Sequence, residues 1–219
     1  MKKRYILMAV TAALVFAVAA GGTMAANRVE TDKISDIATP LASQSLEIEL
    51  GGGNSAGDQT YTAGDKWLAG EDFEEFVVSN SKDISAYVRV TIQKYWIDAK
   101  GDRLAADNVT WEIGADKNWI QQADPFDPTG EGDTVVLYYK TPLATGGQTT
   151  GLLDSLEVLA DVTGNAYSGA TLHVEAVADG VQYAAGHNDV NQNGIKAAWG
   201  VNVTLGDGGA ITSEVTLGS

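Results

Sequence analysis

The chain of 219 residues contains no cysteine, only four prolines and only two histidines. The missing cysteine excludes disulfide scaffolds, cysteine-ligated zinc, iron–sulfur clusters and thiol catalysis. Basic residues are also scarce, with 14 Lys and Arg against 29 Asp and Glu, and none of them cluster after residue 4. Proteins that bind nucleic acid use clustered basic side chains to neutralise phosphates, so this composition argues against a nucleic-acid partner. A hydrophobic content of 44% is nevertheless enough for a packed domain.

Catalytic motifs are missing as well. A zinc hydrolase needs three protein ligands and a general base, typically on an H-E-x-x-H helix, and this sequence offers only His173 and His187. The G-x-S-x-G motif of serine hydrolases is not present either. Paired carboxylates for glycoside hydrolysis stay open as an alternative, because any two of the acidic residues can meet across a groove. The residues therefore favour a protein that is not an enzyme.

The one long hydrophobic run lies at the N-terminus. Three basic residues at positions 2–4 precede an uncharged apolar run at 5–20, which small residues close. This layout is typical of a secretory signal peptide, so we assign the signal to residues 1–25 and expect cleavage after Ala25 or Ala26. An uncleaved membrane anchor is the alternative, since the run approaches the roughly 17 to 25 residues that span a bilayer. The signal predicts a secreted protein whose only membrane contact is the uncleaved signal.

Alternation of apolar and polar residues dominates the mature chain. The strongest run covers residues 87–96, where Val88, Val90 and Ile92 share one face. Further strands are predicted at residues 46–50, 73–78, 109–113, 119–121, 134–139, 155–160, 171–177, 199–205 and 211–217. Helical signals are limited to one turn at 65–70 and a short helix at 188–198. We expect an all-β, jelly-roll-like β-sandwich with few short helices over residues 45–219.

One segment matches the start of a calcium-binding loop. Asp189, Asn191 and Asn193, followed by Gly194, fit the pattern D-x-N-x-N-G, in which oxygens at alternate positions point inward. The acidic residue expected at loop position 12 is missing, because that position is Gly200. We keep calcium as a weak alternative to no cofactor, and a polar turn that caps a short helix is the competing interpretation.

Three segments resemble the TasA and camelysin family of exported bacterial matrix proteins, which a SipW-type signal peptidase processes. The first is the segment 31–50, the second is the passage from Val78 through a polar turn into the strand Ala-Tyr-Val-Arg-Val at 86–90, and the third is 172–178 with the later Ala-Ala-Trp at 197–199. The resemblance spans most of the chain. One departure is the aromatic pair that often follows the cleavage site, which Asn27 and Arg28 replace here.

The resemblance implies a secreted subunit that polymerises with copies of itself into fibres of the biofilm matrix or cell surface, together with accessory fibre or matrix proteins. In such fibres the N-terminal extension, here residues 26–44, acts as a strand donated to a neighbouring sheet. Its apolar anchors are Ile34, Ile37 and Leu41. An open sheet edge accepts such a strand because its N–H and C=O groups lack partners. A disordered tail is the alternative for this extension, and the run at 211–217 is an alternative donor.

Two further functions are weighed against the fibre subunit. The first is a carbohydrate- or surface-binding β-sandwich, which would stack a ligand on exposed tryptophans drawn from Trp67, Trp96, Trp111, Trp119 and Trp199. The second is the metallopeptidase activity that the resemblance to camelysin implies, which the scarcity of histidine disfavours.

Overall fold

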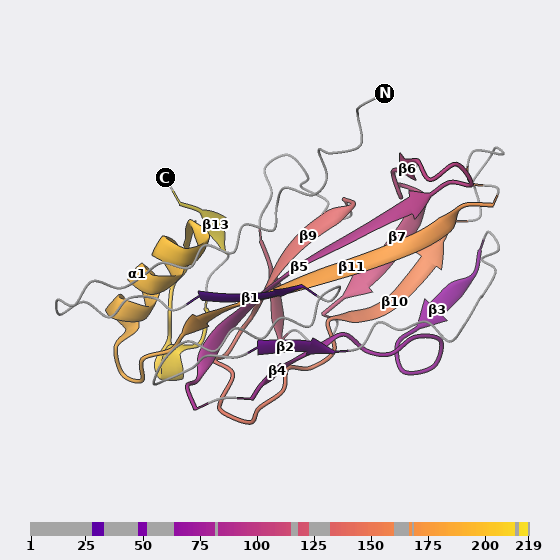
Figure 1. Ribbon diagram of the computed structural model, residues 1–219. Helices are drawn as coiled ribbons and strands as arrows, with labels where there is room; N and C mark the ends of the chain where they lie inside the picture. The colour runs from indigo at the N-terminus through magenta and orange to yellow at the C-terminus, as the bar shows by residue number, and fades with distance from the viewer. Residues whose placement is uncertain are drawn as a thin grey trace.

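The computed structural model describes residues 28–32, 48–51, 64–81, 83–114, 118–122, 132–159, 167, 169–212 and 215–218. Antiparallel sheets make up most of this part of the chain, and α1 (Asn188–Trp199) is the one α-helix in it (Figure 1). The predicted all-β sandwich is therefore confirmed. No helix among these residues is long and apolar enough to cross a membrane.

The larger sheet has six strands and is antiparallel throughout. Its order is β1 (Arg28–Asp32), β11 (Thr171–Gln182), β5 (Ala86–Ile97), β9 (Thr134–Tyr139) and β8 (Trp119–Gln121), with β6 (Arg103–Leu104) pairing β5. The second sheet has the order β3 (Lys66–Leu68), β10 (Leu153–Val158) and β7 (Val109–Ile113). The strands β2 (Ile48–Gly51) and β4 (Val77–Asn80) form a separate antiparallel pair.

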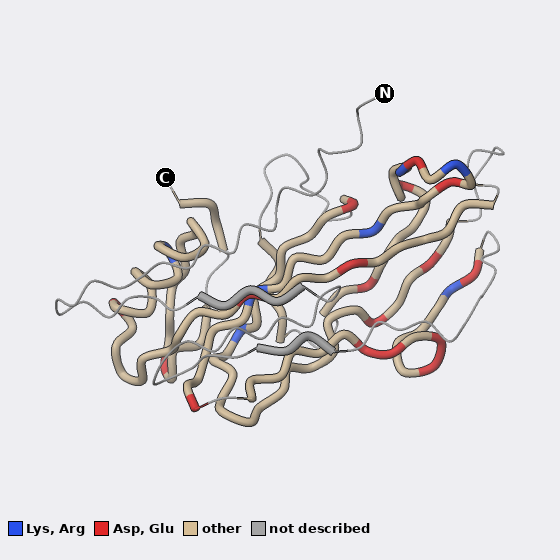
Figure 2. Tube along the Cα trace, viewed as in Figure 1, with Lys and Arg blue, Asp and Glu red and all other residues tan. Residues whose placement is uncertain are grey.

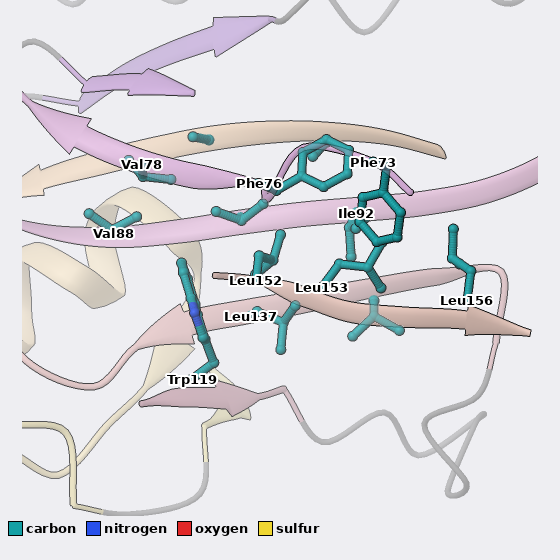
Figure 3. Packing of buried hydrophobic residues seen from close by; sticks show 14 of the residues in the cluster. Phe73, Phe76, Val78, Val88, Ile92, Trp119, Leu137, Leu152, Leu153 and Leu156 are labelled. Atoms are coloured by element: carbon teal, nitrogen blue, oxygen red, sulfur yellow. The ribbon is translucent and has the colours of Figure 1, made fainter. Parts of the chain in front are cut away.

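The main core fills the space between the two sheets (Figure 3). Alternate residues of β5 supply one side of it, because successive side chains of a strand point to opposite faces. Val88, Val90 and Ile92 are fully buried there, as the sequence pattern predicted. Leu153 and Leu156 of β10 and Val109 of β7 face them from the second sheet.

A C-terminal layer covers one half of the other face of the large sheet. It contains α1, β12 (Val201–Asn202), the 3₁₀ turn η2 (Asp207–Gly209) and β13 (Thr216–Leu217). Ile195, Trp199 and Ile211 of this layer pack against Tyr87 and Tyr138 of the sheet. We call the segment 183–218 the C-terminal lobe. Its hairpin pairs β13 with β12, which confirms the expectation that the last run pairs within its own subunit.

Several element boundaries differ from the sequence predictions. The helical turn expected at 65–70 is wrong, because β3 forms there and places the buried Trp67 opposite Leu156 of β10. The strand expected at 199–205 is reduced to β12, since α1 continues to Trp199 and ends at Gly200, whose φ is +70°. In both segments tertiary packing overrides the local pattern. The short helix expected at 188–198 is confirmed.

Candidate strand-docking edge

The edge of the large sheet at β11 combines a long strand with a short neighbour. On one side, β5 pairs with β11 along all 12 of its residues. On the other side, β1 pairs with it only from Val177 to Val181. Among the described residues, no strand pairs with the part of this edge from Thr171 to Ala176. The sheet therefore ends in a five-residue strand that begins two or three positions after the expected signal cleavage site.

Small residues line the core side of this edge. Ala176, Ala178 and Gly180 alternate along β11 on the face that packs into the sandwich, and all three are buried. The register places Val29 opposite Gly180 and Thr31 opposite Ala178. Residues that lie directly opposite each other in an antiparallel pair share one face of the sheet. The register thus places the β-branched residues Val29 and Thr31 directly opposite small residues of β11.

A buried ion pair lies on the other face at the same place. Arg89 of β5 donates to Oδ2 of Asp179 of β11 through Nε at 3.0 Å and through Nη2 at 2.5 Å. The guanidinium carbon of Arg89 also lies 5.4 Å from the centre of the Trp199 ring in the C-terminal lobe. Because the Asp179 side chain is buried and that of Arg89 is partly buried, their Coulomb attraction is stronger than that of a surface pair. This pair links the edge strand to the lobe.

Further along the same face, a polar cluster lies beyond the residues that the lobe covers. Tyr95 donates to Glu175 Oε1 at 2.6 Å, and its ring stacks on His173 with centroids 5.2 Å apart. Gln93 donates to the second oxygen of Glu175, and Arg103 lies over the Tyr95 ring. Burial and the bond to Glu175 raise the pKa of Tyr95 to about 12. His173 and Glu175 lie on the face of β11 that points away from the sandwich core.

The predicted donor residues Ile34, Ile37 and Leu41 lie outside the described residues. Their role stays a prediction. The structure instead adds β1, which lies in the same predicted extension but was not expected as a strand. The sequence pattern that could have predicted β1 is the alternation of Val29 and Thr31 with charged residues. This pattern is short and therefore easy to miss.

The residues of the predicted calcium loop, Asp189, Asn191 and Asn193, lie in a helix. All three lie in the first half of α1, where positions two apart do not share a face. The Asn191 amide is buried and engaged with the backbone, since its Oδ1 accepts from Ala184 N–H at 2.8 Å and its Nδ2 donates to Ala184 O at 2.9 Å. The segment folds as a helix because Ile195 and Trp199 pack into the lobe.

The remaining candidate residues are dispersed. His187 is exposed just before α1, and within the described part of the chain no three His, Asp or Glu side chains gather as metal ligands. The tryptophans belong to the protein interior: Trp67, Trp96, Trp119 and Trp199 are buried, and the half-buried Trp111 packs against the main core. An exposed tryptophan platform for carbohydrate therefore does not form.

No protein-family model matches the sequence, and neither a curated protein nor a solved structure matches it significantly.

Proposed function

We propose that the protein is an exported structural subunit that polymerises into fibres of a biofilm matrix or cell surface. In this proposal the sandwich is a jelly roll of the TasA and camelysin type, as the sequence resemblance implies. The N-terminal extension of one subunit completes the large sheet of the next. Copies of the chain are the main partners, with accessory matrix proteins as further ones, and no catalytic step is involved.

The observation that carries the proposal is the antiparallel pairing of β1 with β11. The strand on this edge, β1, is the first strand after the expected signal. In the mature protein only one or two residues would therefore precede β1. The contacts that β1 makes within one chain are equally available to the β1 of another chain. Because donor and acceptor are different surfaces, exchange between subunits does not close on itself and produces a filament.

The C-terminal run is a weaker donor candidate. Ile211 and Val215 are buried in the lobe, and β13 pairs with β12 of the same chain. Releasing this run would expose the apolar cluster that joins the lobe to the sheet. The N-terminal extension is therefore the better choice.

Deletion of residues 27–44 from the mature protein is the first test. We expect the deletion variant to be a folded monomer that no longer polymerises. Gel filtration measures its oligomeric state, and electron microscopy shows whether filaments form. Filaments that persist unchanged after the deletion would rule out this donor.

Cysteine cross-linking separates docking within a chain from docking between chains. The natural chain has no cysteine, so Thr31→Cys in one subunit and Ala178→Cys in another supply the only thiols. These residues lie opposite each other in the register, and opposed positions suit disulfide geometry. Mixed filaments of the two variants should give disulfide-linked dimers.

The matched control pairs Thr31→Cys with Val174→Cys, four residues further along β11 and out of disulfide reach. Equal dimer yields from both mixtures, or none from the first, would contradict exchange at this edge.

A further inference from the structure

The segment 105–108 crosses from the large sheet, at β6, to the second sheet, at β7. Side chains of the large sheet hold this crossing in place. The carboxylate of Asp133 accepts from Ala106 N–H at 3.1 Å, and Lys94 Nζ donates to the carbonyl of Val109. Lys94 N–H also donates to Asp133 O at 2.8 Å, so the two residues are opposed across β5 and the start of β9. Opposed residues of antiparallel strands share a face, which brings an amine and a carboxylate to the same corner of the sandwich.

Asn108, the last residue of the crossing, adds an amide to this corner. Its Oδ1 accepts from Trp96 Nε1 at 2.8 Å, and Trp96 lies two residues after Lys94 on the same face of β5. Its Nδ2 is buried and has no hydrogen-bond partner among the described residues. A buried polar group without a partner lowers the stability of a protein, so its presence here calls for an explanation.

The side chain of Lys94 points into the sandwich. It is only 1% exposed, and its Nζ lies 4.9 Å from the centre of the Trp111 ring of β7. Burial favours the neutral amine of a lysine side chain, which is its nucleophilic form. The carbonyl to which Nζ donates belongs to Val109, the residue directly after Asn108. A nucleophilic amine and a carboxamide are therefore neighbours in a site shielded from water.

We propose that Lys94 and Asn108 become joined by an isopeptide bond that forms inside the folded sandwich. Lys94 Nζ moves from the carbonyl of Val109 to the adjacent side chain and attacks Asn108 Cγ. The hydrogen bond from Trp96 Nε1 stabilises the negative charge that develops on Oδ1. Asp133 acts as the general base that takes a proton from Nζ and passes it to Nδ2, which leaves as ammonia. One amide replaces another, so the step needs no oxidant, reductant or further reactant.

The bond does for this chain what disulfides do in exported proteins that contain cysteine. It ties β5, inside the large sheet, to the start of β7 in the second sheet, and it closes the β6 hairpin into a covalent loop. Closing a loop stabilises a fold because it restricts the unfolded chain. The bond lies within one subunit, so this inference stands apart from the proposed fibre contact.

The intact mass of the mature subunit, measured after unfolding in denaturant, tests the proposal. We expect a mass lower than that of the sequence by one molecule of ammonia. Tandem mass spectrometry after protease digestion should find the peptides that contain Lys94 and Asn108 joined to each other. Lys94→Met and Asn108→Ala should both have the full mass of their sequences. Lys140→Met is the matched control, because it removes an exposed lysine of the large-sheet side and should keep the loss.

Asp133→Asn separates the chemistry from folding. The substitution keeps the shape of the side chain, and its amide oxygen can still accept from Ala106 N–H, but it cannot carry the proton. The variant should fold, as checked by circular dichroism, and should have the full mass. A folded Asp133→Asn protein that links as fully as the native one would overturn the role of Asp133. The proposal itself is wrong if the native subunit has its full mass, or if Lys94→Met still loses ammonia, since an asparagine can also lose ammonia to its own backbone.

Discussion

At the scale of single residues, Asn80 shows how one buried amide holds three chain segments together. Its side chain is fully buried, and its Nδ2 donates to Ile84 O at 2.8 Å and to Leu143 O at 3.1 Å. Its backbone N–H donates to Gly147 O, and its carbonyl accepts from Gly146 N–H. This residue opens the polar turn before β5, which is one of the segments that resemble the TasA family.

Asn80→Asp should therefore destabilise the fold strongly. The substitution keeps the shape but replaces the donating amide with a carboxylate, which then faces two carbonyl oxygens inside the protein. Each buried polar group left without a partner costs about 1–3 kcal/mol, so we expect a loss of roughly 2–4 kcal/mol in the free energy of unfolding, measured by urea denaturation. Asn202→Asp, at an exposed position, should change it by less than about 0.5 kcal/mol. Similar losses at both positions would refute this role for Asn80.

At the scale of elements, the pairing of β5 with β11 organises the molecule. One face of this pair makes the sandwich core, and the other carries Tyr87 and Tyr95 of β5, beside Tyr138 of the neighbouring β9. Burial raises the pKa of Tyr87 and that of Tyr138 above the ordinary value of 10.0. For Tyr95, burial and the bond to Glu175 raise the pKa to about 12. The folded sheet therefore holds these phenolic protons more tightly than the unfolded chain does.

Alkaline pH should weaken the fold through this face. Between about pH 10 and 12 the unfolded chain loses tyrosine protons that the folded chain retains, so the free energy of unfolding falls as the pH rises through this range. Below pH 10 this contribution is fully present. The urea midpoint should be level from pH 8 to 10 and then decline, and Tyr95→Phe should make the decline shallower. An identical decline in the variant would show that Tyr95 does not contribute.

At the scale of the whole molecule, negative charge dominates. Removal of the expected signal would take away Lys2, Lys3 and Arg4 and no acid, which would leave 11 basic and 29 acidic residues and a net charge of −18. Figure 2 shows acidic residues on strands of both sheets and on the connecting loops. Subunits of this charge repel one another in solution, which opposes casual aggregation. In the proposed fibre, assembly would then need a specific contact such as a docked strand.

Polymerisation should therefore respond to conditions that reduce this repulsion. We expect added salt, divalent cations or low pH to favour it, because screening lengths fall from about 10 Å at 0.1 M salt to about 3 Å at 1 M. Light scattering of the mature protein across these conditions measures the effect. The variant that lacks residues 27–44 is the control and should not scatter, since precipitation by salt alone would not need the extension. If polymerisation does not change with salt, divalent cations or pH, the net charge does not oppose assembly.

The sequence by itself determined the all-β class and the positions of most strands. Alternation along 87–96, 109–113 and 134–139 is a local property, because each strand has one face in the core, and the structure has strands there. Composition also excluded cysteine chemistry without any structure. The prediction of a helical turn at 65–70 failed because packing decided the outcome there: Trp67 lies in a strand that pairs with β10.

Only the tertiary structure decided which strands are neighbours and which side chains meet. Arg89 and Asp179 lie 90 residues apart, and nothing local marks them as a pair. The same holds for β1, whose five residues become a strand because β11 offers an unpaired edge lined by Ala178 and Gly180. Asn191 fitted a calcium motif by its spacing, but helix packing turned its amide toward the backbone of Ala184. Periodicity records which face a residue takes, whereas partners across a sheet depend on register and strand order, which long-range packing sets.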